Sequence, residues 1–308
     1  MILTVCPNPC IDYTIEVENL NVGRLTRIDN KIKHYAGKAC NTAIGAARLG
    51  LDVVASGFTF DQDREAFQNY LEKEGVKCDF VLNEGALRVN FKIIDGKSML
   101  TELNDSGQEV TQEKQKELLD LIKNVQEDIS ATVISGSLPK GVKADYYYAL
   151  VKAAKGKVVV DCEKDNLKKA ISAGVYMIKP NLYELESFNK ESYKSYDEML
   201  KGCRKLIDAG AENVLLSLGT QGAVLTDGVN SYYCRSENVA VNSTVGAGDS
   251  MIAAACHCIE NGAYGEELLR SAVAAGTASV TTPGTSLFTK KKYLEIYKKL
   301  KVSKITNI

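Results

Sequence analysis

The feature that most limits the fold is a regular alternation of predicted helices and strands through the middle of the chain. Amphipathic helices are predicted at residues 113–123, 145–154, 166–173 and 196–209, and each precedes an apolar strand, at 131–135, 157–161, 176–179 and 213–218. Such alternation is typical of strands that lie parallel in one sheet, with helices covering its faces. The sequence therefore predicts an α/β fold with a central, mostly parallel sheet.

The first third of the chain extends this pattern and also interrupts it. Apolar strands and amphipathic helices continue the alternation at residues 2–5, 43–49, 53–57 and 65–73. Other segments alternate polar with apolar side chains, at residues 11–17, 27–35, 87–95 and 99–103. A period of two is typical of strands with one face in water. We expect these strands to form a small appendage outside the core.

Polar residues gather where the predicted strands of the main sheet end. They are Ser137, Asp161, Asn181, Glu184, Ser217 and Gly219. The carboxyl ends of parallel strands lie at one edge of a sheet, and open sheets of this kind bind ligands there. The sequence therefore predicts a ligand site at this edge.

A glycine-rich turn, Thr244-Val245-Gly246-Ala247-Gly248-Asp249, follows an extended segment at 238–241 and leads into an apolar helix at 251–256. The start of a helix leaves backbone N–H groups unpaired, and these attract anions. Asp249 beside such a site fits phosphoryl transfer, because the N–H groups can stabilise the moving phosphoryl group while the carboxylate accepts a hydroxyl proton. The alternative is a tight turn in which Asp249 only stabilises the helix terminus.

The sequence leaves the roles of three cations open. Lys38 follows Gly37 before a predicted helix and could be a solvated lysine near the helix start. Arg88 and Lys92 lie on one face of a strand, either as a solvated edge or as a phosphate clamp.

The pattern in the last part of the chain predicts a helix at 265–275 and a basic amphipathic helix at 290–300. We expect the second helix to pack on the sheet, with its basic face in solvent.

Composition excludes several classes of function. The 308 residues are 45% hydrophobic and carry a formal net charge of −1, which gives no sign of a nucleic-acid or membrane surface. No apolar stretch approaches membrane-spanning length, and the N-terminus lacks the features of an export signal. Nine cysteines without a Cys-x-x-Cys pair are typical of reduced thiols used as small apolar residues. We expect a cytoplasmic protein.

A series of short motifs occurs in order along the chain: Pro7-Asn8-Pro9 with Asp12, Gly37-Lys38 with Asn41, Arg88-x-Asn90-x-Lys92, Ser135-Gly136-Ser137-Leu138-Pro139, Lys179-Pro180-Asn181-x-x-Glu184, Ser217-Leu218-Gly219-x-x-Gly222 and the turn that ends at Asp249. The ordered set resembles the ribokinase-like (PfkB) carbohydrate kinases, specifically the 1-phosphofructokinase and tagatose-6-phosphate kinase group. The resemblance implies a single kinase domain over residues 1–308, folded as a three-layer α/β/α sandwich. It also implies that segments 11–36 and 87–105 form a β lid, which covers the sugar and pairs two chains as a homodimer.

The resemblance implies a role for each matching residue. Asp249 would be the catalytic base, and Gly246, Ala247 and Gly248 would form the anion hole. The phosphorylated sugar would be held by Asp12, Arg27, Gly37, Lys38, Asn41, Arg88 and Ser137, of which Arg88, Arg27 and Ser137 would grip its phosphate. ATP would be bound by Lys179, Asn181, Glu184, Ser217, Gly219, Gly222, Thr244 and Gly248. Asn181 and Glu184 would hold Mg²⁺ through water.

The sequence departs from the family pattern where the sugar would lie. Ala36 replaces the first of two glycines before the lysine, and Phe60-Asp61-Gln62-Asp63-Arg64 replaces a glycine-rich loop. Asp161-Cys162-Glu163 differs from the more usual Asp-Thr-Ser. In the loop, the two aspartates could pair with Arg64, contact the sugar hydroxyls or turn outward into solvent.

Together these features predict ATP-dependent phosphorylation of a ketohexose monophosphate to a bisphosphate. Fructose 1-phosphate, which would give fructose 1,6-bisphosphate, is favoured over tagatose 6-phosphate. A kinase for an unphosphorylated sugar or a nucleoside would leave Arg88 and Lys92 with nothing to bind. A non-catalytic sugar-phosphate sensor would have no need of a base at Asp249.

Overall fold

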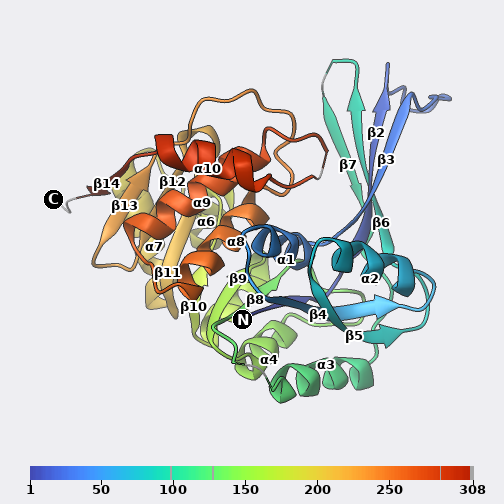
Figure 1. The fold of residues 1–308 in the computed structure, drawn as a ribbon, viewed down its shortest axis with the longest axis horizontal. Coiled ribbons are helices and arrows are strands. Elements are labelled where there is room, and N and C mark those ends of the chain that lie inside the picture. Colours follow the sequence, from blue (N-terminus) through green and yellow to red (C-terminus); the bar gives the residue numbers. More distant parts are fainter. Residues whose placement is uncertain (98, 127, 285, 306–308) are drawn as a thin grey trace.

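A computed structural model describes residues 1–97, 99–126, 128–284 and 286–305. Its centre is a sheet whose described strands run in the order β14, β13, β12, β11, β10, β9, β8, β1, β4, β5 (Figure 1). Neighbouring strands are parallel from β5 to β11, and β12, β13 and β14 extend one edge in antiparallel pairs. The strands are β1 (Ile2–Cys6), β4 (Val53–Phe60), β5 (Lys77–Asn83), β8 (Ala131–Ser135), β9 (Lys157–Asp161), β10 (Val175–Ile178), β11 (Ala211–Ser217), β12 (Ala223–Thr226), β13 (Ser231–Cys234) and β14 (Val302–Ile305).

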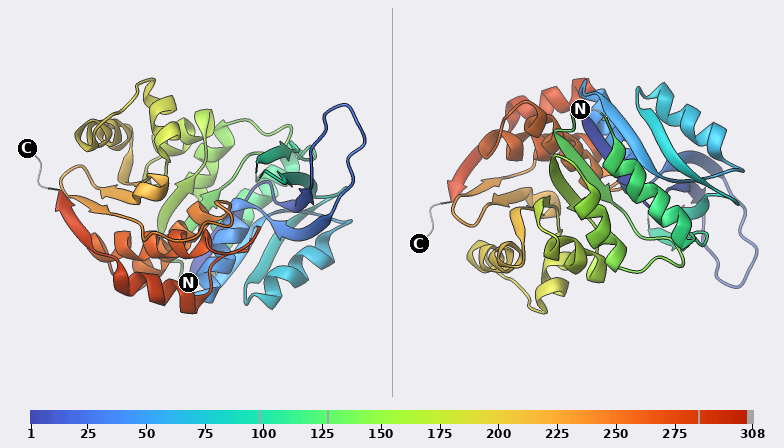
Figure 2. Two further views of the ribbon diagram at one scale, coloured as in Figure 1. Left: turned by 90° about the horizontal axis from the view of Figure 1, so that it is seen from above. Right: turned by 90° about the horizontal axis from the view of Figure 1, so that it is seen from below.

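Helices cover both faces of this sheet (Figure 2). One face carries α1 (Lys38–Arg48), α2 (Arg64–Lys73), α8 (Ala247–Glu260), α9 (Glu266–Ser279) and α10 (Lys290–Lys299). The other carries α3 (Gln112–Asn124), α4 (Asp145–Ala153), α5 (Lys164–Ser172), α6 (Leu182–Asn189) and α7 (Tyr196–Asp208). The three-layer α/β/α arrangement predicted from the sequence is confirmed. The central strands are buried on both faces, which explains why β1, β8 and β9 read as continuous apolar runs.

A second, small sheet projects away from the main one (Figure 1). It consists of β2 (Cys10–Val17), β3 (Asn30–Ala36), β6 (Arg88–Asp95) and β7 (Leu100–Asn104), in the order β3, β2, β6, β7. The register places Asp12 of β2 between His34 of β3 and Asn90 of β6. The strands lie within the two predicted segments, except that β2 begins at Cys10, one residue earlier.

The sequence did not predict the elements at the margins of the fold. These are β5, β12, β13, β14 and α6. Strands β12, β13 and β14 span only four residues each, too short for a clear period. Within the described ranges, no helix is long and apolar enough to cross a membrane.

Residues 238–241, expected to be extended, belong to no strand, and the N–H groups of Asn242 and Ser243, which follow them, bond the carbonyl of Val280 at the end of α9. One prediction about the C-terminal part was wrong. Helix α10 packs mainly on α9 and not on the sheet.

Candidate active site

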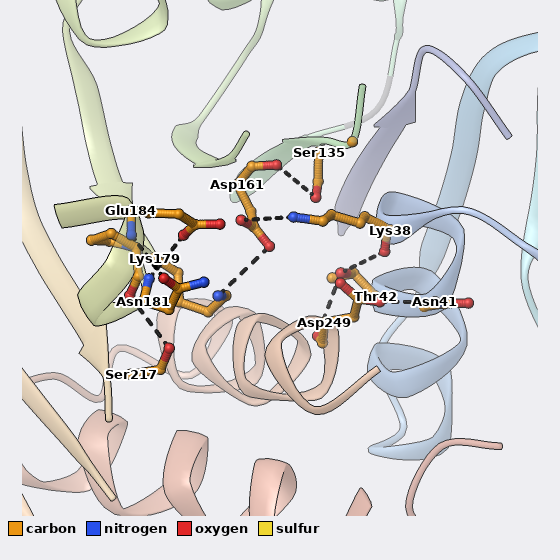
Figure 3. A network of polar contacts seen from close by, with 12 residues as sticks. Lys38, Asn41, Thr42, Ser135, Asp161, Lys179, Asn181, Glu184, Ser217 and Asp249 are labelled. Atoms are coloured by element: carbon orange, nitrogen blue, oxygen red, sulfur yellow. Dashed lines mark hydrogen bonds and ion pairs between the residues drawn. The ribbon is translucent and has the colours of Figure 1, made fainter. Parts of the chain in front are cut away.

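The sequence-predicted residues of the main sheet come together at its carboxyl edge (Figure 3). Asp161 ends β9, Lys179 follows β10 directly, and Ser217 ends β11. Lys38 and Asp249 reach the same place from the first turns of α1 and α8. The edge at which parallel strands end therefore collects four charged side chains and one hydroxyl group from five separate parts of the chain.

The glycine-rich turn places the first turn of α8 in the site. Gly246 has a φ of 78°, which favours glycine, and a Cβ there would lie 2.7 Å from Cδ2 of Leu287. A Cβ on Gly248 would lie 3.0 Å from Nζ of Lys179. The N–H groups of a first helical turn have no carbonyl partner within the helix. This turn can therefore receive an anion, with Lys179 close to it.

Close packing of α1 against α8 sets the position of Asp249. A Cβ on Gly45 would lie 2.8 Å from Cβ of Ala253, so the glycine lets the two helices approach. One turn earlier on each helix, Nδ2 of Asn41 donates a hydrogen bond of 2.8 Å to Oδ2 of Asp249. Asn41 thus holds one oxygen of a carboxylate that is 5% exposed.

The surroundings of Asp249 suit a base. Burial raises the pKa of its carboxyl to about 6, and the negative charge of Asp161 acts in the same direction. Lys38, the Asn41 hydrogen bond and Lys179 oppose these effects without outweighing them. A pKa near neutral is the value that best serves proton transfer at physiological pH.

Asp161 lies between two lysines (Figure 3). Its Oδ1 is 3.4 Å from Nζ of Lys38, and its Oδ2 is 3.7 Å from Nζ of Lys179. Burial opposes ionisation of this carboxyl, but the two lysines outweigh it and the pKa of Asp161 lies below its ordinary value. In turn, Asp161 raises the pKa of Lys38 despite partial burial. Asp161 and Lys38 are therefore both charged at neutral pH.

Gly37 precedes Lys38 for a packing reason. Its φ is 138°, and a Cβ there would lie 2.6 Å from Sγ of Cys6. The glycine lets the chain enter α1 directly over the end of β1, which brings Lys38 to the site. This backbone role is compatible with the predicted sugar contact and does not require it.

Asn181 and Glu184 form the capping box of α6. The Asn181 side chain accepts from the Glu184 N–H, and Oε2 of Glu184 accepts from the Asn181 N–H, both at 2.8 Å. Burial and then Asp161 raise the pKa of Glu184, an electrostatic cost that a nearby cation would relieve. Among the described residues, no group of three or more acidic, His or Cys side chains could hold a metal ion. A Mg²⁺ ion here would need phosphate oxygens, with Asn181 and Glu184 reaching it through water.

The remaining predicted nucleotide residues lie on the same side. Ser217 pairs with Asn181 through an isolated bridge, and Gly219 begins a short 3₁₀ turn at residues 219–221. Gly222 has a φ of 93°, and a Cβ there would lie 2.0 Å from the carbonyl oxygen of Cys234. Thr244 is exposed, and its carbonyl accepts from the Ala247 N–H at 3.4 Å. Packing alone therefore requires the glycine at 222.

The small sheet does not present its charges as the sequence suggested. Lys92, expected on a solvated edge or a phosphate clamp, is buried in an ion pair with Oδ2 of Asp12. Oδ1 of Asp12 accepts from Nδ2 of Asn90 at 3.0 Å. The Asp12 carboxylate is thus already paired on both oxygens, and Lys92 is not free to clamp a phosphate.

Arg88 does face a polar corner. Its Nε donates to the carbonyl of Asn8 at 3.1 Å, and its Nη1 donates to the carbonyl of Asp105 at 2.9 Å. Nδ2 of Asn8 in turn donates to Oγ of Ser137 at 3.1 Å. The structure thus brings Arg88 and Ser137 to one place through Asn8, and the guanidinium keeps further N–H groups for a ligand.

Arg27 is not part of this corner within one chain. It is exposed in the loop between β2 and β3. Arg88 pairs with Cys10 at the start of β2, whereas the loop follows Val17, about 23 Å further along the strand at 3.3 Å per residue. The prediction that Arg27 assists Arg88 therefore finds no support in a single chain.

The altered loop at residues 60–64 hydrogen-bonds the backbone of the segment that precedes β6. Oδ1 of Asp61 accepts from the Gly85 N–H at 2.8 Å, and Oδ2 of Asp63 accepts from the Leu87 N–H at 2.9 Å. Arg64 donates instead to Gln68 of its own helix at 3.1 Å. The aspartates therefore hold the segment that leads into β6 and Arg88, an arrangement that none of the three alternatives described.

Two residues of this site were not assigned a role from the sequence. Asp161 was noted as a polar strand end and as the first residue of a segment that departs from the family pattern, and Asn8 was noted only as part of a motif. For Asp161 the available signal was a carboxylate directly after the apolar strand Val158–Val160 at the ligand edge. Its contact with lysines from distant segments could not be read from the sequence.

Comparison with known proteins gives the family. Residues 7–292 match the description pfkB family carbohydrate kinase. The chain belongs to the pfkB family. It is thus a carbohydrate kinase, a phosphotransferase with an alcohol acceptor, and the resemblance to this family is confirmed.

Relatives and solved structures agree with this assignment. The chain is 28% identical to 1-phosphofructokinase of Vibrio cholerae over 98% of this chain and 96% of that one. It is 32% identical to D-tagatose-1-phosphate kinase of Bacillus licheniformis over 92% and 94%. The crystal structure of Phosphofructokinase-2 from Escherichia coli in complex with substrates and products superposes with a TM-score of 0.90 at 27% identity, covering 97% and 98%. The pfkB kinase fold thus extends over nearly the whole chain.

Proposed function

We propose that this protein transfers the terminal phosphoryl group of ATP to a hydroxyl of a ketohexose monophosphate, with fructose 1-phosphate as the acceptor. The observation that carries the proposal is the buried Asp249 at the start of α8. Its carboxyl has a pKa of about 6, and Asn41 holds one of its oxygens. The other oxygen would take the proton of the attacking hydroxyl, while N–H groups of residues 246–248 stabilise the phosphoryl group.

The donor would lie along the ends of β10 and β11. The oxygen-rich pair Asn181 and Glu184 fits a Mg²⁺ ion that is bound chiefly by phosphates. When bound, this ion would neutralise phosphate charge. Lys179, packed against Gly248, would contact the phosphate that lies next to the anion hole. Ser217, Gly219, Gly222 and Thr244 are the proposed contacts to the rest of ATP.

The acceptor would lie between the small sheet and the main sheet. Arg88 would bind its existing phosphate together with Ser137, while Gly37, Lys38 and Asn41 would contact hydroxyl groups. Asp12 would do so through the acceptor positions that Lys92 and Asn90 leave on its carboxylate. The names of the two relatives both point to a ketohexose phosphorylated at position 1. Tagatose 1-phosphate is therefore the second candidate, ahead of tagatose 6-phosphate.

The small sheet would act as a lid and as a dimer interface. Val22, Leu25, Ile28, Leu100 and Leu103 are each about half exposed or more, on or near one sheet. Apolar side chains gathered on a projecting sheet favour a partner surface. We propose a homodimer that pairs through this sheet, and Leu25→Asp should shift the mass measured by light scattering toward the monomer.

Coupled ADP release with Mg²⁺ and ATP tests the proposed function. The acceptors are fructose 1-phosphate, tagatose 1-phosphate, tagatose 6-phosphate, free fructose and a nucleoside. We expect kcat/KM to be highest for fructose 1-phosphate and at least about 30-fold lower for free fructose, because a charged contact to phosphate contributes 2 kcal/mol or more. A free sugar or nucleoside as the best acceptor would contradict the proposal, and no acceptor-dependent ADP release would favour a sensor.

A further inference from the structure

We propose that Asp161 is a positioning residue for phosphoryl transfer: its carboxylate holds Lys38 on the acceptor side and Lys179 on the donor side of the reacting phosphoryl group. This inference rests on the proposed function. Asp161 acts through the two lysines and does not itself contact the reacting atoms.

The first support is where the three groups come from. Lys38 starts α1, Asp161 ends β9, and Lys179 follows β10 (Figure 3). The two ammonium groups contact different oxygens of one carboxylate, at 3.4 Å and 3.7 Å. Because Lys179 also packs against Gly248, the carboxylate links the anion hole to the start of α1.

The second support is the charge itself. A carboxylate beside a site for phosphates is unfavourable unless it performs a task there. The side chain of Asp161 is only 3% exposed, and its backbone carbonyl already accepts from the Ser135 hydroxyl and the Gly136 N–H. Those bonds hold β8 to β9 without the carboxylate. The task that remains for the carboxylate is to hold the lysines.

The third support is what the lysines would do alone. Two ammonium groups near one point repel each other, and Lys38 has a side chain that is 38% exposed and therefore free to turn toward solvent. The side chain of Lys179 is 7% exposed and cannot turn toward solvent in this way. Asp161 thus keeps both cations in place before substrate binds, which is the preorganisation that electrostatic catalysis needs.

Asp161 also influences the base. The groups that face Asp249 are Asn41 and Lys38 on α1, Asp161 at the end of β9 and Lys179 after β10. The charge of Asp161 raises the pKa of Asp249, and the two lysines lower it. Removing the Asp161 charge should therefore let Asp249 ionise at lower pH.

A double-mutant cycle tests the proposal. Asp161→Asn and Lys38→Met are each expected to reduce kcat by about 100-fold, the scale for loss of one preorganised group. The double variant should lose no more than about tenfold beyond the larger single loss, because the residues act as a unit. Asp165→Asn, on the exposed start of α5, is the matched control and should leave kcat unchanged.

Two further readouts separate positioning from other roles. The acidic limb of kcat/KM should move to lower pH in Asp161→Asn. Additive losses in the cycle, or an increased Mg²⁺ requirement with no pH shift, would overturn the proposal in favour of a structural or metal-holding role. If Asp161→Asn fails to fold, Lys38→Met alone still tests the proposal: kcat should fall about 100-fold and the acidic limb should move to higher pH, because Lys38 lowers the pKa of Asp249. An unchanged kcat in Lys38→Met would overturn the proposal.

One readout does not depend on kinase activity. Because Asp161 raises the pKa of Lys38, Asp161→Asn should increase the acylation rate of Lys38 at a fixed pH by about threefold or more. Mass spectrometry of a limited reaction with an amine reagent measures this rate. An unchanged rate would overturn the inference, whereas an inactive parent with an increased rate would reject only the proposed function.

Discussion

Two buried carboxylates, Asp249 at the carboxyl edge of the main sheet and Asp12 on the small sheet, are held in different ways. Asp249 is buried, and among the described residues it is Asn41 whose side chain bonds the carboxylate, on one oxygen; burial raises the pKa of this carboxyl to about 6. On the small sheet, Asp12 is paired on both oxygens by Lys92 and Asn90. A carboxylate with one oxygen unpaired can accept a proton, whereas a carboxylate paired on both oxygens fixes the positions of its neighbours. The edge is thus suited to chemistry, and the small sheet to presenting a fixed surface.

The largest expected effect concerns the base at the edge. Asp249→Asn should reduce kcat by about two to four orders of magnitude, because the amide cannot accept the hydroxyl proton. Binding of the sugar phosphate, measured by calorimetry, should change little. A kcat within tenfold of the parent would remove Asp249 from the role of base.

The next effect tests whether the pair on the small sheet is structural. Lys92→Met should lower the free energy of unfolding by roughly 3–5 kcal/mol, because Asp12 would be left buried without its partner. Denaturant titration measures this change. The double variant Asp12→Leu, Lys92→Met should recover most of the loss, and no recovery would show that the two side chains are not coupled.

Arg88 lies in the polar corner with Asn8 and Ser137, where we propose that the sugar phosphate binds, so its loss should act on binding. Arg88→Ala should raise KM for the sugar phosphate, with a loss of roughly 2–5 kcal/mol in kcat/KM if the charge pair is buried. Activity on the unphosphorylated sugar should hardly change. Arg64→Ala is the matched control because Arg64 is exposed and donates to Gln68 of its own helix. Equal losses on both sugars would make Arg88 structural.

The pH profile gives a smaller effect at the edge. Asp249 must be ionised to act, so kcat/KM should fall below a pH of about 6, approaching tenfold per pH unit. The fall occurs on the acidic side because protonation fills the accepting oxygen. A limb that is centred two or more units lower would show that another group controls the rate.

The smallest effect concerns the loop at residues 61–64. Asp61 and Asp63 bond the backbone N–H groups of Gly85 and Leu87, just before Arg88. The triple variant Asp61→Gly, Asp63→Thr, Arg64→Gly should therefore raise KM slightly, because Arg88 is held less firmly in place. The ratio of kcat/KM between fructose 1-phosphate and tagatose 6-phosphate should stay within threefold. A larger change would mean that the loop contacts the sugar.

The sequence could predict features that depend on local patterns, but not contacts between distant segments. Parallel strands end at one edge, so Asp161, Asn181 and Ser217 could be assigned to a common site from their positions alone. The turn before Asp249 carried its own signal in two glycines. Partners across distant segments, such as Lys38 with Asp161 or Lys92 with Asp12, depend on packing that no local pattern encodes. Short strands such as β14, which pairs with β13 some 70 residues earlier, could not be predicted for the same reason.

Asn181 and Glu184 show how one pattern can carry two meanings. The spacing Asn-x-x-Glu matches a family motif for phosphate binding, and it is also the signature of a capping box. The structure contains the capping box and a helix, α6, that the sequence did not predict. One oxygen of each residue serves the cap, and the remaining polar atoms are the ones available to a hydrated cation.

The most direct test of the account is to identify the product by ³¹P NMR. Fructose 1-phosphate, ATP and Mg²⁺ are incubated with the parent protein and, separately, with Asp249→Asn. The account predicts that the parent converts the sugar to a species with two phosphomonoester signals, in equal amount to the ADP formed, and that the variant forms almost none. ADP accompanied only by inorganic phosphate, or equal conversion by the variant, would contradict it.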